Sequence, residues 1–283
     1  MGSASSLVEK DVAVGRRWWE ARAWQTNAAL ALIGVGLFLL SRELVIEYHH
    51  YAIGFSGTSG WSVVLYLAAV WLVMAQPVDR WTLPIVLVAA VACRLEPLFA
   101  KPFLSSDIYR YVWDGIVQHA HISPYRYVPG DAALSFLRAP HQNVFDNINR
   151  RDYAHTIYPP VAEMLFYLVT WVSPTVRGMK VAMVGFEAVT VGALLMLLKG
   201  LSRRPAEVLL YAWCPVLWWE IAGSGHLDSM AMAFIALALV TRMRRRDVWT
   251  GVFLGIAVMI KFYPLVLLPA LWRRGDWKMP ATV

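Results

Sequence analysis

Long apolar stretches separated by short polar intervals dominate the chain. Their approximate positions are 24–46, 61–78, 82–100, 157–173, 180–198, 205–221, 228–241, 249–260 and 262–272. The longest of them match the span of about 20 apolar residues that a helix needs to cross a bilayer. A spanning helix also satisfies its own backbone hydrogen bonds, which the hydrocarbon core demands. The pattern therefore predicts an all-α fold: a polytopic helical membrane protein.

Composition and charge agree with this prediction. Hydrophobic residues make up 58% of the chain and charged residues 16%, against about 25% charged in soluble proteins. A soluble globular domain is thereby excluded. The net charge of +7 is concentrated in short clusters beside the ends of the apolar stretches, which is typical of contact with the lipid bilayer and argues against binding of nucleic acid.

The basic clusters also predict an orientation. Residues 1–23 are polar and carry Arg16, Arg17 and Arg22 just before the first apolar stretch, so we expect a retained first helix and a cytoplasmic N-terminal segment. The remainder, 24–283, is expected to form one transmembrane domain. Three spans then bring the chain to the outer side near Lys101.

The stretch 157–173 decides the rest of the topology. If it spans, the basic clusters at 199–204 and 242–246 fall outside, against the positive-inside rule. If it lies on the outer surface, both clusters and 273–274 become cytoplasmic, and Pro159 and Pro160 suit the start of such a helix. We expect the second arrangement, with an extracytoplasmic loop at 101–179. The same counting predicts two short helices within 249–272, broken at "KFYP".

Charges and rings stand together at "SSDIYRYVWDG", 105–115. On a helix Asp107, Arg110 and Asp114 share one face, while aromatic and aliphatic side chains occupy another. We expect an amphipathic helix on the outer surface, with Asp107 near its start as an ionised base and Asp114 bridging Arg110 at i+4. A bridge that only stabilises the helix is the alternative.

Three further patterns suggest binding. Tyr125, Arg126 and Tyr127 in "SPYRY" could hold a hydroxylated ring, or could form an ordered loop. His226 and Asp228 in "GSGHLDS", and Lys261 with Tyr263 in "KFYP", are candidate contacts for a phosphate. Helix packing and a snorkelling lysine are the respective alternatives.

Metal and cysteine chemistry are not indicated. His119 and His121 diverge on a helix, and no carboxylate stands at ligand spacing from them. A divalent metal could assist a leaving phosphate, but no ligand set in the sequence demands one, and the sequence indicates no cofactor. Cys93 and Cys214 lie in apolar stretches, where a packing thiol is expected.

The order of "SSDIYRYVWDG", "SPYRY", "TIYPP", "GSGHLD" and "KFYPLVLLP" resembles membrane glycosyltransferases of the GT-C class over roughly 80–275. It is most similar to bacterial mannosyltransferases that use polyprenyl-phosphate mannose and to their glycosyltransferase-87-like relatives. The resemblance implies a polyprenyl-phosphate sugar donor, a glycan or glycolipid acceptor, and Asp107 as catalytic base. Sugar or acceptor binding would then fall to Arg110, Asp114, Tyr125, Arg126, Tyr127 and Tyr158, and donor-phosphate binding to His226, Asp228, Lys261 and Tyr263.

Two alternatives stay open at this point. Charged groups beside broken helices also suit a membrane transporter, although transporters place such groups near the bilayer midplane. Enzymes of the class continue for several helices beyond the position of Val283. A second membrane subunit could supply those helices, and this chain could instead be a non-catalytic partner in a split glycosyltransferase.

Overall fold

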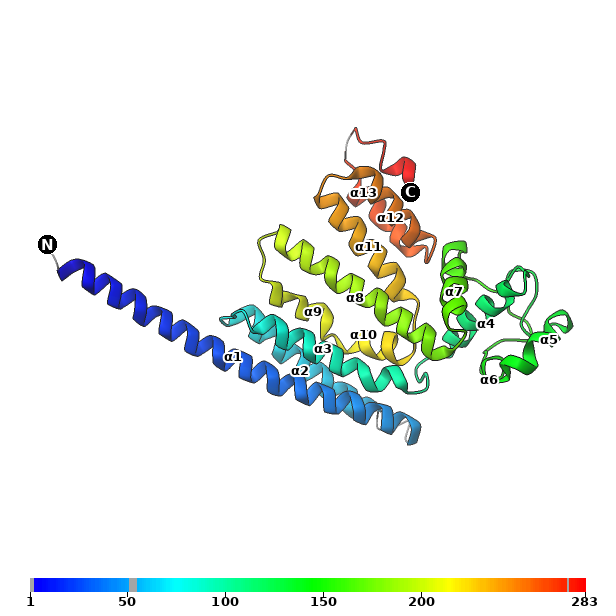
Figure 1. The fold of residues 1–283 in the computed structure, drawn as a ribbon, viewed down its shortest axis with the longest axis horizontal. Helices are drawn as coiled ribbons and strands as arrows, with labels where there is room; N and C mark the ends of the chain where they lie inside the picture. Colours follow the sequence, from blue (N-terminus) through cyan, green and yellow to red (C-terminus); the bar gives the residue numbers. More distant parts are fainter. Residues whose placement is uncertain (1–2, 51–54, 274) are drawn as a thin grey trace. The chain divides into compact units, whose positions relative to one another are not determined.

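The computed structural model is built of helices (Figure 1). It describes residues 3–50, 55–273 and 275–283, and the side chains of 22–46, 57–273 and 275–283. Arg16, Arg17 and Arg274, used above to predict the orientation, lie outside the described side chains. The described backbone contains no strand. The all-α prediction is confirmed.

The chain divides into two compact units, which we describe separately. Unit 1 comprises Met1–Glu96 and Arg203–Pro215, and unit 2 comprises Pro97–Ser202 and Val216–Val283. Unit 1 contains α1 (Ser3–His50), α2 (Phe55–Ala75), nearly all of α3 (Thr82–Phe99), and the short α9 (Leu209–Ala212). In Figure 1 the blue helices α1 and α2 run side by side.

Polar contacts join the elements of unit 1. Asn27 on α1 donates to Asp79 Oδ1 at 2.8 Å and accepts from Thr82 Oγ1 at 2.7 Å. The indole of Trp213 donates to the carbonyl of Val86 at 2.8 Å. Arg94 reaches the carbonyl of Ala212 at 2.9 Å. The segment at 203–215 is thus held to α3 by buried groups that would otherwise lack partners.

Unit 2 holds the remaining helices. They are α4 (Asp107–His119), α5 (Ser135–Arg138), α6 (Gln142–Phe145), α7 (Pro160–Val172), α8 (Val176–Gly200), α10 (Pro215–Leu217, beginning at the last residue of unit 1), α11 (Asp228–Met243), α12 (Asp247–Val258) and α13 (Leu268–Leu271). Helix α11 packs against α8 and α12, and α4 packs against α7. A buried apolar cluster centred on α4, α7 and α8 forms its core.

Four helices within the described residues are long and apolar enough to cross a membrane: Arg22–Ile46, Gly57–Ala75, Thr82–Phe99 and Val176–Gly200. They correspond to four of the predicted stretches. Helix α7 has 13 residues and is therefore about 20 Å long, short of the roughly 30 Å of a hydrocarbon core. Its length agrees with a helix that does not span, and its surface position stays a prediction.

One predicted helix is wrong. The stretch 205–221 is not continuous: a 3₁₀ turn at Pro205–Val208 and α9 precede a break at Cys214, and α10 then runs into a π-helix at Trp218–Gly223. Pro215 disfavours the helical conformation of the residue before it, which explains the break. The predicted interruption at "KFYP" is confirmed, because α12 ends at Val258 and a 3₁₀ turn begins at Tyr263.

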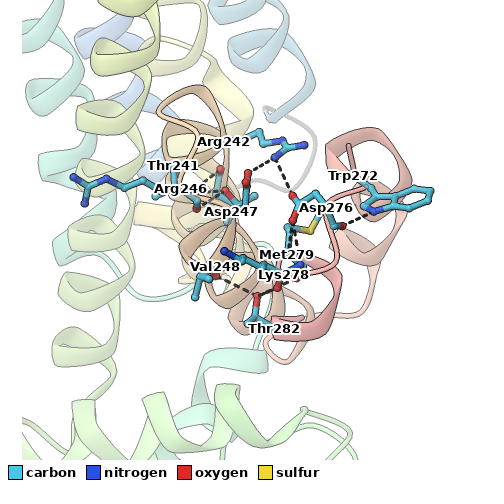
Figure 2. Close-up of polar contacts among 12 residues, drawn as sticks. Thr241, Arg242, Arg246, Asp247, Val248, Trp272, Asp276, Lys278, Met279 and Thr282 are labelled. Atoms are coloured by element: carbon cyan, nitrogen blue, oxygen red, sulfur yellow. Dashed lines mark hydrogen bonds and ion pairs between the residues drawn. The ribbon is translucent and has the colours of Figure 1, made fainter. Parts of the chain in front are cut away.

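The C-terminal residues pack against α11 and α12. Figure 2 shows the carboxylate of Asp276 accepting from Arg242 and from the backbone N–H groups of Lys278 and Met279, at 3.4, 3.1 and 3.3 Å. Thr282 donates to the carbonyl of Val248 at 3.2 Å. A methyl group on Gly251 would collide with this segment, so the glycine permits the close approach.

Candidate functional site

Helix α4 presents the first group of site residues. Asp107 is the first residue of α4 and is half-buried. The backbone N–H of Asp107 donates to Ser105 Oγ at 3.2 Å. Asn149 donates to Asp107 Oδ1 at 3.2 Å. These contacts agree with the predicted place of Asp107 at the start of the helix.

The rest of α4 corrects the picture of a surface helix. Val112 and Trp113 are buried as expected of an apolar face, but Arg110 and Asp114 are buried as well, at 7% and 1% exposure. Helix α7 packs against α4, and its Glu163 meets Gln118 and Asp114 on the polar side, whereas Phe145 on α6 contacts Trp113. Gly115 makes this possible, since a Cβ there would lie 2.8 Å from the carbonyl oxygen of Phe166 on α7. Asp114 is therefore an interior carboxyl.

The predicted i+4 bridge is confirmed. Arg110 Nε lies 2.8 and 3.0 Å from the two carboxylate oxygens of Asp114, and its Nη1 donates to the carbonyl of Ala154 at 2.9 Å. The third guanidinium nitrogen is buried without a hydrogen-bond partner. Burial raises the pKa of Asp114 to about 6, although the positive charge of Arg110 acts in the opposite direction.

Glu163 on α7 completes this buried cluster and was missed by the sequence analysis. Its side chain accepts from Thr156 Oγ1 at 2.7 Å and from Gln118 Nε2 at 3.1 Å. Burial, followed by the charge of Asp114, raises its pKa to about 9. A signal existed in the sequence: Glu163 is a lone acid in an apolar helix, and such residues are rare without a function.

A pocket of about 240 Å³ opens beside Asp107. It is lined by Asp107, Arg110, Asn149, Arg150, Ala154, His155, Thr156, Ile157 and Tyr158. The pocket places one carboxylate among basic and hydroxyl groups, which suits a polar, hydroxylated or anionic ligand. Its wall at 149–155 was not predicted, because these residues belong to none of the motifs identified in the sequence.

Aromatic side chains extend from this pocket. Tyr158 contacts the ring of Tyr111 edge-on at 5.0 Å between centroids, and Tyr111 stacks on Phe166 at 4.6 Å. The hydroxyl of Tyr125 donates to the carbonyl of Tyr158 at 2.7 Å, so two predicted sugar-binding residues do meet. The guanidinium of Arg126 lies over the ring of Tyr127, 5.1 Å from its centroid. This contact orders the loop, in agreement with the alternative that "SPYRY" forms an ordered loop.

The second predicted group also forms a cluster. Lys261 Nζ donates to both carboxylate oxygens of Asp228, at 2.7 and 2.8 Å. His226 Nδ1 lies 3.4 Å from Glu220 Oε2, so the histidine faces a glutamate that the sequence analysis did not select. The negative charge of Asp228 contributes to the raised pKa of Tyr263, after burial.

The tyrosine pair connects the two groups. Burial is the main reason why the pKa of Tyr111 lies well above its usual range, and the carboxylates of Asp107 and Asp228 both add to the effect. Tyr158, whose ring contacts that of Tyr111 edge-on, also raises the pKa of Tyr111. The carboxylates of Asp107 and Asp228 thus both act electrostatically on the same tyrosine.

Among the side chains that the structure describes, no group of three His, Cys, Asp or Glu residues is placed to hold a metal ion. His119 instead contacts Thr170 Oγ1 at 3.1 Å and stacks on Tyr167. His121 follows in a left-handed turn with φ of 59°. These two histidines therefore pack and turn the chain.

Comparison with known proteins gives one match. Residues 156–283 match the model of glycosyltransferase family 87. Neither the curated proteins nor the solved structures include a match to the chain. The resemblance noted in the sequence is therefore confirmed over this part, which contains Tyr158, Glu163 and the cluster around Lys261, and it indicates a glycosyltransferase. Helix α4 and the "SPYRY" loop precede the matched residues.

Proposed function

We propose that this membrane glycosyltransferase transfers a sugar, mannose, from a polyprenyl-phosphate donor to a glycan or glycolipid acceptor at the outer face of the membrane. The observation that carries the proposal is the position of Asp107. It is a half-buried carboxylate at the start of α4, it lines a pocket, and Asn149 donates a hydrogen bond to it. A general base needs this combination of access and ionisation.

The reaction follows from that geometry. The acceptor hydroxyl oxygen attacks the anomeric carbon of the sugar, and the bond from that carbon to the phosphate oxygen breaks. The hydroxyl proton passes to the carboxylate of Asp107, and the polyprenyl phosphate leaves with the bonding electrons. Positioning of the two substrates and stabilisation of the leaving charge supply the remaining rate enhancement.

Binding of the sugar or acceptor is proposed for the pocket and its aromatic border. Tyr158 and Arg110 line the pocket, and Tyr125 is bonded to the backbone of Tyr158. Arg126 and Tyr127 form the neighbouring stacked pair. Asp114 contributes indirectly, because it is buried and bonded to Arg110.

Binding of the donor phosphate is proposed for the cluster around Lys261. Lys261 and Asp228 are both partly exposed, at 42% and 34% of their side chains, so solvent weakens their attraction and an incoming phosphate can compete for the ammonium group. His226 and Tyr263 are the neighbouring donors. The charge of Asp228 then opposes phosphate binding and must be offset by the contacts that form.

The test uses the full chain in proteoliposomes with radiolabelled polyprenyl-phosphate mannose. Label transferred to a glycan or glycolipid acceptor supports the proposal. If hydrolysis of the donor and transfer of the sugar both appear only after a second membrane subunit is added, this chain is part of a split enzyme. Uptake of labelled substrate into the vesicle lumen without any transfer would make the chain a transporter and overturn the proposal.

A further inference from the structure

The cluster behind the pocket contains more carboxyl groups than positive charges. Arg110 supplies one positive charge, while Asp114 and Glu163 can each supply one negative charge. All three side chains are buried, and Glu163 is 3% exposed. A second uncompensated negative charge in such a place is costly.

The hydrogen bonds identify the group that avoids this charge. Asp114 and Glu163 each alter the pKa of the other carboxyl, so the two groups lie close together. Two ionised carboxylates side by side in a buried place repel each other, so one member of the pair carries a proton. Asp114 receives both bonds from Arg110 Nε, which favours its ionised form. The proton therefore belongs on Glu163.

The surroundings of Glu163 agree with a neutral acid. From α4 the charged groups that act on it are Asp114 and Arg110. The loop before α7 contributes the hydroxyl of Thr156, and Tyr125 faces the same two carboxyls. Helix α8 also packs against α7, but its buried Lys180 is held by the carbonyls of Pro97 and Ala100, at 2.9 and 2.8 Å.

We propose that Glu163 is a positioning residue that stays protonated, bonds to Asp114 through its proton, and holds Thr156 in the wall of the pocket beside Asp107. The role rests on the proposed function of that pocket. A neutral Glu163 leaves the Arg110–Asp114 pair balanced, so that Asp107 is the negative group that the substrate meets. An ionised Glu163 would add a second negative charge next to an anionic donor and would release its bond to Asp114.

The chemical test is infrared spectroscopy, in which a protonated carboxyl absorbs apart from carboxylates. At neutral pH the spectrum of the parent protein minus that of Glu163→Gln should contain a protonated-carboxyl band. The band should disappear as the pH rises through about 9, the pKa to which burial and Asp114 raise this group. Glu207→Gln is the matched control, because Glu207 is bonded to Arg203 and Arg204 and its pKa is lowered. Its difference spectrum should lack the band.

Two further measurements keep the inference testable if Glu163→Gln folds poorly. Thr156→Val should shift the band, since it removes the bond to Glu163 Oε1. The parent protein alone should lose the band between pH 7 and about 10. A parent spectrum without a Glu163 band at pH 7 would overturn the inference whether or not the protein transfers sugar. A band without any transfer activity would count against the proposed function only.

Activity provides the readout of positioning. The transfer rate of the parent should decline as the pH rises through about 9, whereas Glu163→Gln, normalised to its own rate at neutral pH, should lack this decline. Glu163→Leu should transfer more slowly than Glu163→Gln, because glutamine can still donate to Asp114 and accept from Thr156. Equal rates for the two variants would show that Glu163 only fills space.

Discussion

The ammonium group of Lys261 is bonded to both carboxylate oxygens of Asp228, at 2.7 and 2.8 Å. Both residues were predicted from the sequence to bind the donor phosphate. In the structure they form an ion pair with each other. Binding of a phosphate to Lys261 therefore has to exchange one anionic partner for another. Substitutions of Lys261 and of Asp228 should therefore change the affinity for the donor in opposite directions.

Lys261→Met should weaken donor binding about tenfold, the effect of losing one charged hydrogen bond. Asp228→Asn should strengthen it, because the ammonium group is then free for the phosphate. Equilibrium binding of a polyprenyl-phosphate sugar in detergent measures both. Lys278→Met, at an exposed lysine of the C-terminal segment, is the control. An unchanged affinity in Lys261→Met would identify Lys261 as a lysine that only extends to the headgroups.

Asp107→Asn should lower the transfer rate by about 10²–10⁴-fold, the usual cost of losing a positioned base. Donor affinity and thermal stability should stay close to those of the parent. Asp107 is only half-buried, and the substitution affects one hydrogen bond, which Asn149 donates to its carboxylate. Asp152→Asn changes an exposed carboxylate in the loop that contains Asn149. This control substitution should leave the transfer rate unaltered. If Asp107→Asn transfers sugar at the parent rate, the base lies elsewhere, and Asp228 is the next carboxylate to test.

Asp114→Asn should mainly affect stability. It removes the charge that balances Arg110 inside the protein, and breaking a buried pair costs about 3–5 kcal/mol. We expect the lower end, about 3 kcal/mol, because Glu163 can ionise in its place and restore the balance. Transfer activity should remain measurable in the folded fraction. Denaturation followed by circular dichroism checks the prediction, and a variant as stable as the parent would contradict the buried pair.

Gly115→Ala should destabilise unit 2 by about 1–3 kcal/mol, the usual cost of overpacking. The added methyl group would lie 2.8 Å from the carbonyl oxygen of Phe166 and would collide with Thr170, so α4 and α7 must separate. Gly185→Ala on α8 is the matched control, since its Cβ would meet no atom within 4 Å. Thermal unfolding compares the two. Equal effects would show that α4 and α7 do not need this approach.

Single cysteines at Arg177 and Arg203 test the predicted topology. Both positions are exposed, and the two native cysteines, Cys93 and Cys214, are first replaced by alanine. An impermeant maleimide added from outside should label position 177 and leave position 203 unlabelled. Labelling of 203 alone would place α7 across the membrane and invert the predicted arrangement.

The class of fold and the local contacts were predictable from the order of the amino acids. Apolar length predicts spanning helices because the bilayer has a fixed thickness, and the four long helices follow from it. The bridge from Arg110 to Asp114 was predictable because residues four apart always meet on a helix. The start of a new 3₁₀ helix at Tyr263 agrees with Pro264, since proline is tolerated in the first turn of a helix.

What covers each face of a helix depends on tertiary packing. Periodicity cannot tell whether the polar face of α4 meets water or another helix, and here α7 buries it. Glu163 becomes a member of the site because it lies opposite Asp114 in space, 49 positions further along the chain. Thr156 and Asn149 line the same pocket as Asp107 because the loop before α7 passes beside the start of α4. Partners brought together by packing leave no periodic signal in the sequence, so the protonation state of the cluster is a property of the folded chain alone.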